Sequence, residues 1–162
     1  MSRLDSVIRR LRAQRACLNM AEGLIAGITG PILELGLGNG RTFDHLRCLF
    51  PDREIFVYDR QVAAHPDCIP DDRHMIIGDI RETLPLALSR IGAPAALAHA
   101  DIGTGDQAIN AEIASFLGRT LPGLMAPDAV ILADRPLAMA GWREQGLPSG
   151  VRPGRYFVYR RT

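Results

Sequence analysis

The segment from residue 31 to residue 42, Pro-Ile-Leu-Glu-Leu-Gly-Leu-Gly-Asn-Gly-Arg-Thr, most constrains what this chain can fold into. It opens with a short apolar run typical of a buried strand, and a predicted helix over residues 41–50 follows it. A strand, a glycine turn and a helix form a nucleotide site at the carboxyl edge of a parallel sheet. Because Gly36, Gly38 and Gly40 lack a Cβ atom, the chain can turn sharply there and a ligand can approach the backbone closely.

The spacing of the glycines decides which ligand this loop suits. The dinucleotide fingerprint requires a third glycine at position 41, where this chain has Arg41. The observed spacing is Gly-x-Gly-x-Gly, with Glu34 two residues before the first glycine. This pattern resembles motif I of the class I S-adenosylmethionine (SAM)-dependent methyltransferases, in which an acidic residue at the end of the first strand precedes the same spacing.

The resemblance extends to the end of the next predicted strand. Residues 54–59 form an apolar run that ends in Asp59, 23 positions after Gly36 and near the distance of about 20 expected for an acidic group on the second strand. A carboxylate there can accept hydrogen bonds from both hydroxyls of a ribose, and the matching residue of the family does so for the adenosine of SAM. The alternative is a surface Asp at a strand end.

The third predicted strand, residues 74–77, ends just before Asp79. In the family, an acidic or amide residue at this place contacts the adenine amino group. Asp79 could equally be the N-cap of the next helix, with Glu82 three residues on as in a capping box, and both interpretations stay open. An apolar slot between Tyr58 and Ile80 would suit the adenine ring.

The resemblance therefore implies that SAM is the cofactor and that the glycine loop and the following strand ends bind it. The implied SAM-binding residues are Glu34, Gly36, Gly38, Asn39, Gly40, Arg41, Thr42, Tyr58, Asp59, Asp79, Ile80 and Asp101.

The remaining pattern alternates strands and helices and predicts an α/β doubly wound, mostly parallel sheet in a three-layer αβα, Rossmann-like arrangement. Further helices are expected over residues 2–27, 81–90, 106–121 and 136–146, and further strands over 95–101, 129–134 and 156–160. The family usually ends in an antiparallel hairpin. Only its last strand is obvious here, so we expect a shortened C-terminal hairpin in which residues 148–152 form the partner or the partner is missing.

Length and composition predict a single domain over residues 1–162, with a helical cap at 1–29 and an α/β core at 30–162. The net charge of +1 does not indicate any particular class of binding partner. The cysteines, Cys17, Cys48 and Cys68, are odd in number and lack CxxC spacing, which favours reduced thiols in the cytoplasm over a zinc or disulfide site. The sequence has neither the apolar core of a signal peptide nor a run long enough to span a membrane.

The first predicted helix combines an apolar stripe with arginines. Its apolar positions fall at helical spacing, namely Leu4, Val7, Ile8, Leu11 and Leu18. A basic helix can contact nucleic acid or an acidic partner, whereas most charge runs are solvated faces. Since no substrate domain is inserted elsewhere, we expect this helix to bury its stripe, to bend at Gly23 and Gly27, and to act as a lid over the ligand site.

The methyl-transfer step constrains the catalytic candidates only weakly. Positioning can supply most of the rate, and a general base is needed only for a protonated acceptor. Candidates at the ends of the fourth and fifth strands are Asp101, Asp106, Asp134 and Arg135, with Asp101 preferred because it should lie next to the methyl group. His99 falls inside the fourth strand and is predicted to be a core histidine.

Two departures from related subfamilies narrow the function. The Asn/Asp-Pro-Pro-Tyr/Phe motif of many amino-group methyltransferases is replaced by the sequence from Asp101 to Thr104. Metal-dependent catechol-type enzymes have an Asn where this chain has Arg135, which leaves a cation one ligand short, so no metal is predicted.

Three functions follow from these patterns. The leading one is SAM-dependent methyl transfer to a small-molecule acceptor. The others are a non-catalytic SAM-binding module or partner subunit, and a nucleic-acid methyltransferase, which the absent motif disfavours. Because so small a domain has a thin lid, we expect a homo-oligomer that completes the site.

Overall fold

The structure is a computed structural model that describes residues 2–162, and it contains a seven-stranded sheet in the order β3-β2-β1-β4-β5-β7-β6. The strands are β1 (Ile32–Leu35), β2 (Ile55–Asp59), β3 (Met75–Ile77), β4 (Ala95–Ala100), β5 (Met125–Ala133), β6 (Trp142–Glu144) and β7 (Phe157–Arg161). The first five are parallel, whereas β7 pairs antiparallel with β5 and β6 antiparallel with β7. The strand order reverses direction between β1 and β4, which is where open α/β sheets bind ligands.

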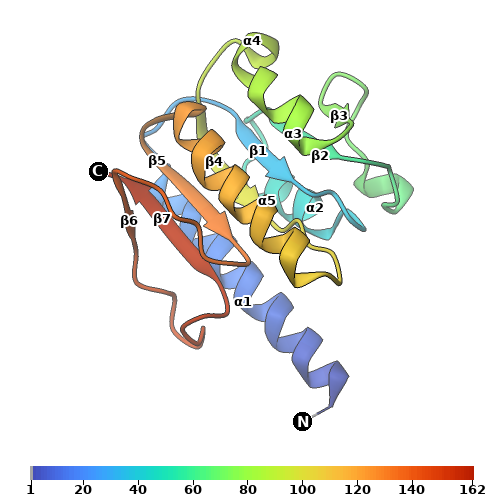
Figure 1. The fold of residues 1–162 in the computed structure, drawn as a ribbon, viewed down its shortest axis with the longest axis vertical. Coiled ribbons are helices and arrows are strands. Elements are labelled where there is room, and N and C mark those ends of the chain that lie inside the picture. Colours follow the sequence, from blue (N-terminus) through green and yellow to red (C-terminus); the bar gives the residue numbers. More distant parts are fainter. Residues whose placement is uncertain (1) are drawn as a thin grey trace.

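Helices cover both faces of the sheet and complete three layers (Figure 1). The α-helices are α1 (Arg3–Leu24), α2 (Arg41–Leu49), α3 (Ile80–Thr83), α4 (Ala87–Ile91) and α5 (Gln107–Thr120), and the 3-10 turns are η1 (Pro66–Cys68), η2 (Leu84–Leu86) and η3 (Leu121–Gly123). One apolar core lies between the sheet and α1 with α2, and the other lies on the opposite face under α3, α4 and α5. The predicted doubly wound α/β fold is confirmed.

The N-terminal helix α1 is held at both of its ends by specific polar contacts. Ser2 and Asp5 form a capping box, in which each side chain accepts a hydrogen bond from the backbone of the other. Beyond the last turn, the Arg53 guanidinium donates to the carbonyl oxygens of Ile25, Ile28 and Gly30 at 2.7–3.0 Å. These bonds fix the route by which the chain enters β1.

The expected burial of the whole apolar stripe on α1 is wrong. Leu18 is buried, but Leu4, Val7 and Ile8 expose 68%, 44% and 38% of their surface. The first turns of α1 project beyond the body of the molecule (Figure 1), and the helix ends at Leu24, before the second of the two glycines at which a bend was expected. The role of residues 1–29 as a lid, and their separation from the core at 30–162, stay predictions.

Two predictions for the C-terminal region are also wrong. Residues 142–144, expected within a helix, form strand β6, and Trp142 pairs with Arg161 of β7. The partner of β7 is therefore β6 and not residues 148–152, which form a turn and its irregular flanks. The hairpin is complete in strand number, although β6 has only three residues.

The single helix expected over residues 81–90 is divided into α3, η2 and α4. Pro85 lies in the middle of this segment, where its missing N–H cannot continue an α-helical ladder. Strand β5 begins at Met125, four residues before its predicted start, and Asp128 takes a positive φ of 59° where the pairing register with β4 shifts. None of the helices in residues 2–162 is both long and apolar enough to cross a lipid bilayer.

The unequal burial along α1 gives a stability test. Leu18→Ala should lower the free energy of unfolding by about 2–5 kcal/mol, because it opens a cavity in a packed core. The matched control Leu4→Ala, at an exposed position of the same helix, should change it by about 0.5 kcal/mol or less. Urea unfolding at one protein concentration measures both, and an equal loss for the two variants would contradict the observed packing.

Candidate active site

The carboxyl ends of β1, β2 and β4 open into two adjoining cavities. The first, called here the strand-end cavity, has a volume of about 220 Å³ and extends over β2 and β3. The second, called the helix-side cavity, has a volume of about 390 Å³ and lies under α1. Gly36, Gly38, Asp101 and Gly103 line both. Together the two cavities fall in the size range of small-molecule sites.

The glycine loop is shaped by two different demands on its backbone. Gly36 has φ +98°, and a Cβ atom built there would lie 2.8 Å from the backbone oxygen of Asp101, so any side chain would force β1 and β4 apart. Gly38 has φ +52°, and a Cβ atom there would meet nothing within 4 Å. Gly36 therefore lets two protein segments approach, whereas the space beside Gly38 is open for a ligand.

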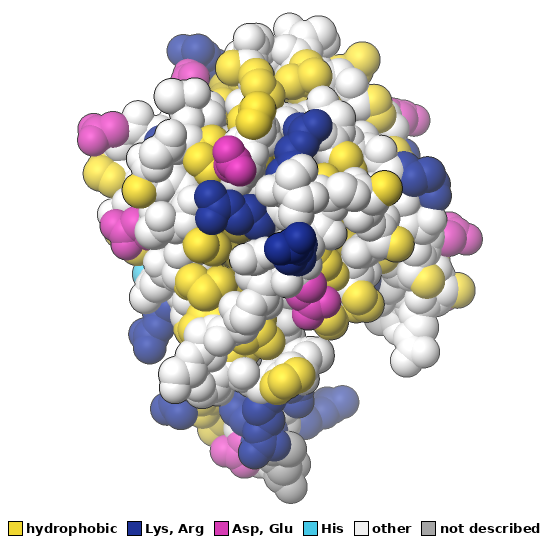
Figure 2. All heavy atoms as spheres, turned by 90° about the vertical axis from the view of Figure 1, so that its left-hand side faces the viewer, with side chains coloured by type: hydrophobic (Ala, Val, Ile, Leu, Met, Phe, Trp, Pro, Cys, Tyr) yellow, Lys and Arg dark blue, Asp and Glu magenta, His cyan; other side chains and the backbone are white. Residues whose placement is uncertain are grey.

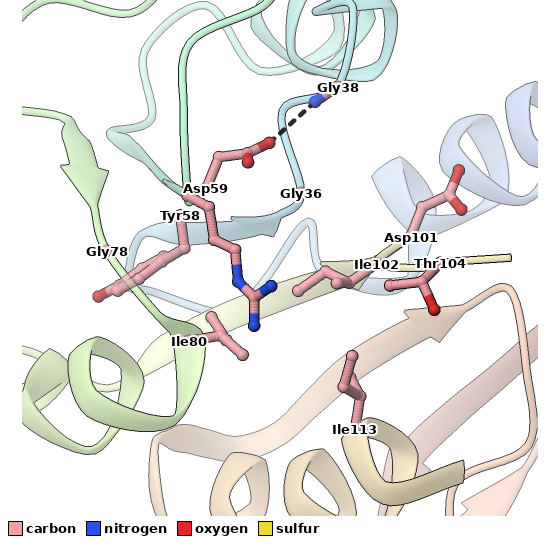
Figure 3. Close-up of a pocket in the computed structure, with 12 residues that line it drawn as sticks. Gly36, Gly38, Tyr58, Asp59, Gly78, Ile80, Asp101, Ile102, Thr104 and Ile113 are labelled. Atoms are coloured by element: carbon pink, nitrogen blue, oxygen red, sulfur yellow. Dashed lines mark hydrogen bonds between the residues drawn. The ribbon is translucent and has the colours of Figure 1, made fainter. Parts of the chain in front are cut away.

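The side chain of Asp59 closes the loop onto β2. Its Oδ2 accepts hydrogen bonds from the backbone N–H groups of Leu37 at 2.8 Å and Gly38 at 3.1 Å, and the second of these is drawn in Figure 3. Its Oδ1 accepts only a long bond of 3.3 Å from the Gln61 N–H. Asp59 thus lines the strand-end cavity, and its Oδ1 retains capacity for further donors, whereas its contact with a ribose stays a prediction.

The strand-end cavity has an apolar floor. Tyr58, Ile80, Ile102 and Ile113 surround it in Figure 3 and come from β2, α3, the segment after β4 and α5. The Tyr58 hydroxyl has no hydrogen-bond partner among the described residues, and burial raises the pKa of Tyr58 to about 12. A flat, uncharged group would suit this slot, because a charge would lose its hydration without gaining a partner.

Asp79 caps the amino end of α3, which is one of the two roles predicted for it. Its Oδ1 accepts a hydrogen bond of 2.9 Å from the Arg81 N–H and caps α3. This bond lowers the pKa of Asp79, as does the Arg60 guanidinium 2.9 Å from Oδ2. The N-cap is confirmed, although Glu82 forms no capping box. Asp79 does not itself line the cavity, whereas its partner Arg60 does.

The helix-side cavity is organised around Asp101, whose carboxylate points away from the apolar slot in Figure 3. Its Oδ2 accepts a hydrogen bond of 2.7 Å from Gln14 and forms a 3.2 Å ion pair with Arg10, both from α1. Within residues 2–162, Oδ1 has no hydrogen-bond donor. One oxygen is therefore held by α1, while the other is free to accept a proton or a hydrogen bond.

Some of the other residues predicted around the glycine loop line a cavity, and the rest pack behind the loop. Asn39, Arg41 and Thr42 line the helix-side cavity. Gly40 lines neither cavity, and a Cβ atom there would lie 2.5 Å from that of Cys68. Glu34 is fully buried beneath the loop and also lines neither cavity. Direct contact of these two residues with a ligand stays a prediction.

Glu34 is the centre of a buried polar network between β1, β4 and Tyr156, the residue before β7. Its Oε1 accepts a hydrogen bond from the Thr42 hydroxyl, and its Oε2 lies 2.6 Å from Nδ1 of His99. The His99 Nε2 in turn bonds the Tyr156 hydroxyl. His99 and Glu34 are neighbours in the register of β4 and β1, so strand pairing itself brings them together. The prediction of a core histidine is confirmed.

Opposing effects act on the pKa of His99. Burial alone would lower it, but the Glu34 carboxylate outweighs this effect and raises the pKa above its ordinary value, with Asp101 and Asp134 adding to the shift. The Glu34 carboxylate therefore favours the protonated form of His99 below the glycine loop.

The remaining catalytic candidates are occupied by other contacts. Asp106 caps α5 through bonds of 2.7 Å and 3.2 Å to the N–H groups of Ala108 and Ile109. Asp134 lines the helix-side cavity but forms a bidentate pair with Arg135, at 2.9 Å and 2.7 Å. Across residues 2–162, the structure groups no three His, Cys, Asp or Glu side chains as metal ligands.

Sequence reasoning missed Arg10, Gln14, Arg60 and Tyr156 as parts of this region. Arg10 and Gln14 lie 91 and 87 positions before Asp101, so no local spacing connects them. Arg60 follows Asp59 directly and could have been found as the next residue on the same strand end. Glu34 and His99 could have been paired by noting that both interrupt apolar strands that are neighbours in the predicted sheet.

Comparison with known proteins relates this geometry to a family. A family model described as S-adenosyl-L-methionine methyltransferase matches residues 1–161. The crystal structure of an S-adenosyl-L-methionine methyl transferase from Silicibacter pomeroyi DSS-3 superposes with a TM-score of 0.93 and 44% sequence identity. The match covers 100% of this chain and 99% of that one.

More distant structures show the same fold. A putative caffeoyl-CoA O-methyltransferase from Staphylococcus aureus has a TM-score of 0.61 and 11% identity, covering 90% of this chain and 83% of that chain. The plantazolicin methyltransferase BpumL, solved in complex with SAH, has a TM-score of 0.52 and 16% identity, covering 76% and 46% of the two chains. No curated protein matches the chain.

The His99–Glu34 pair predicts a pH dependence of stability. Because the folded state raises the pKa of His99 above the ordinary value of 6.5, the stability contributed by this group is full below that pH and is lost as pH rises through the folded-state pKa. The free energy of unfolding should therefore fall as the pH rises above the ordinary pKa of 6.5. In the double variant Glu34→Gln/His99→Gln this component should disappear, and urea titrations at each pH measure it. Identical slopes for the two proteins would contradict the assignment.

Proposed function

The chain belongs to the S-adenosyl-L-methionine methyltransferase family, and we propose that its acceptor is a small molecule that binds in the helix-side cavity beside Asp101. The enzyme class, the fold and the cofactor predicted from the sequence are confirmed. The observation that carries the proposal is the pair of cavities that meet at Gly36, Gly38 and Asp101, because cofactor and acceptor need adjoining sites.

The residues of the strand-end cavity fit the adenosine of SAM. The apolar slot between Tyr58 and Ile80 suits the adenine ring, and Asp59 Oδ1 can accept hydrogen bonds from the ribose. The open space beside Gly38 permits close approach to the backbone. Asp79 would act at the adenine edge through Arg60, which it holds at the mouth of the cavity.

The methionine part of SAM would extend along the glycine loop towards Asp101. Asn39, Arg41 and Thr42 line this side, and the loop leads into the amino end of α2, where backbone N–H groups attract a carboxylate. Glu34 and Gly40 would contribute indirectly. Glu34 anchors Thr42 from below, and Gly40 permits the close contact of the loop with Cys68.

The chemistry that SAM supplies is an electrophilic methyl group, whose carbon bonds to the acceptor nucleophile as its bond to sulfur breaks. The chain's contribution is to hold the acceptor in line with that carbon and to exclude water. Arg10 and Gln14 fix one oxygen of Asp101, and its free Oδ1 can remove a proton from an acceptor O–H or N–H group. We assign Asp101 this catalytic role.

The form of the helix-side cavity supports a small acceptor. This cavity is bounded by α1 on one side and by Asp101, Gly103 and Asp134 on the other. Within residues 2–162, no inserted domain adds to its walls. A bulky polymer would have to displace Arg10 and Gln14 from Asp101 before it reached the reacting atoms.

We also propose that the protein is a cytoplasmic homo-oligomer. The exposed Leu4, Val7 and Ile8 on the projecting turns of α1 support a contact with a second copy, since isolated chains seldom leave such a stripe in water. Cys17, Cys48 and Cys68 are free thiols, which is consistent with a reducing compartment. Sedimentation at several protein concentrations tests the first point, and a monomer throughout would rule it out.

The assignment of Asp59 predicts a loss of cofactor affinity. Asp59→Ala should weaken SAM binding by about 1–3 kcal/mol, or roughly 5- to 150-fold, because hydrogen bonds to a charged acceptor are lost. Asp59→Asn, which keeps an oxygen for the Leu37 and Gly38 N–H groups, should lose less. Calorimetry measures both, with the exposed Asp72→Ala as the control. Unchanged affinity in Asp59→Ala would show that the ribose is held elsewhere.

The assignment of Asp101 predicts a loss of turnover. Asp101→Asn should lower the rate of S-adenosylhomocysteine formation by about 10²- to 10⁴-fold for an acceptor that arrives protonated, and should affect SAM affinity much less. The matched control is Asp106→Asn, because asparagine also caps a helix well and Asp106 is exposed. Acceptors are first found by mass spectrometry of a metabolite mixture. Equal rates in the two variants would exclude Asp101 as the base.

A further inference from the structure

A third cavity, separate from the two described above, lies between α1 and the loop that precedes β7. Its volume is about 550 Å³, and its walls are formed by residues 9–16 of the helix and 149–155 of the loop. Five arginines line it, namely Arg9, Arg12, Arg15, Arg152 and Arg155. No aspartate or glutamate among the described residues does so. Figure 2 shows basic side chains gathered at the lower end of the molecule, where α1 begins.

The local structure explains why these arginines meet. On α1, Arg9, Arg12 and Arg15 recur at intervals of three residues, which places each next to the following one on the same side of the helix. The loop contributes two successive turns, closed by the hydrogen bonds from Val151 N–H to Pro148 O at 3.1 Å and from Arg155 N–H to Arg152 O at 3.2 Å. The turns bring Arg152 and Arg155 to the same cavity.

The charges of this cavity have no internal compensation. Within residues 2–162, none of the five guanidinium groups forms an ion pair or donates a side-chain hydrogen bond. Elsewhere, Arg10 forms an ion pair with Asp101, and Arg53 donates hydrogen bonds to backbone carbonyl oxygens. The Nη2 atom of Arg9 is buried without any partner. Asp5 influences Arg9 from one turn away, but its carboxylate is occupied by the N-cap at Ser2. Such a cluster attracts an anion, and arginine favours planar or tetrahedral oxyanions.

The cavity also adjoins the proposed acceptor site through the chain itself. Arg9 and Ala13 of its helical wall directly precede Arg10 and Gln14, the two residues that hold Asp101. On the loop side, Arg155 directly precedes Tyr156 of the buried network. The helix that carries three of these arginines therefore also carries the two residues that hold Asp101.

We propose that this arginine-lined cavity binds an oxyanionic group, a phosphate or a carboxylate, of the methyl acceptor. The inference rests on the proposed function, and it names the acceptor's class as a small anion. A cavity between two walls, open to solvent on the side of Arg12, Arg15, Arg152 and Arg155, suits a compact oxyanion better than the extended backbone of a nucleic acid.

The binding test uses inorganic phosphate as the probe and calorimetry as the readout. Arg152→Gln/Arg155→Gln removes two charges from the cavity, and Arg73→Gln/Arg119→Gln removes two charges from outside it as the matched control. We expect phosphate affinity to fall at least about tenfold in the first variant and to stay unchanged in the control, since charge-assisted bonds are lost only in the cavity. Arg9→Gln should give an intermediate loss. SAM affinity should be the same in all proteins, which reports an intact fold. Equal phosphate affinity in the two double variants, or no binding to the wild type, would overturn the proposal.

A second experiment identifies the source of the anion. Methyl-accepting activity in a metabolite extract should be retained by an anion-exchange resin, and inorganic phosphate should raise the KM for the purified acceptor without changing kcat. Phosphate that binds but does not compete would place the anion on a separate ligand and overturn the proposal. So would cavity-dependent binding of a single-stranded RNA that phosphate cannot displace. If phosphate and SAM both bind but no acceptor is methylated, the failure lies with the proposed small-molecule acceptor and not with the anion site.

Discussion

The close approach of Gly36 to the backbone of Asp101 is the constraint on which the site depends. A Cβ atom at Gly36 would lie 2.8 Å from the Asp101 carbonyl oxygen, so only glycine lets the ends of β1 and β4 come this near. This contact joins the two cavities, because both residues line each of them. The joining of the two cavities and the position of Asp101 are therefore consequences of one backbone arrangement.

The buried polar network stabilises that arrangement from beneath. Glu34 connects the first turn of α2, through Thr42, to His99 on the neighbouring strand, and His99 connects to Tyr156 before β7. Removing one member would leave a buried charge or donor without a partner, which costs more than a surface contact. The network therefore fixes how the glycine loop, β4 and the C-terminal strands sit relative to one another, and so it fixes the positions of Asp59 and Asp101.

The parts that the sequence predicted are those encoded locally. The apolar runs ending at Leu35 and Asp59 and the glycine spacing identify the parallel strands and the glycine loop, because period and turn chemistry act over a few residues. Strand β6 was mistaken for helix because Trp142 to Glu144 has no alternation, and its conformation comes from pairing with β7. Arg10 and the arginine-lined cavity depend on contacts between segments far apart in the chain, which no spacing reveals.

The central claim is that SAM occupies the strand-end cavity and extends along the glycine loop towards Asp101. A crystal structure of the protein with S-adenosylhomocysteine tests it most directly. We predict the adenine between Tyr58 and Ile80, the ribose on Asp59, and the sulfur on the side of Asp101 that faces α1. Adenosine density elsewhere, or a sulfur atom remote from Asp101 with the helix-side cavity free of ligand, would contradict the account.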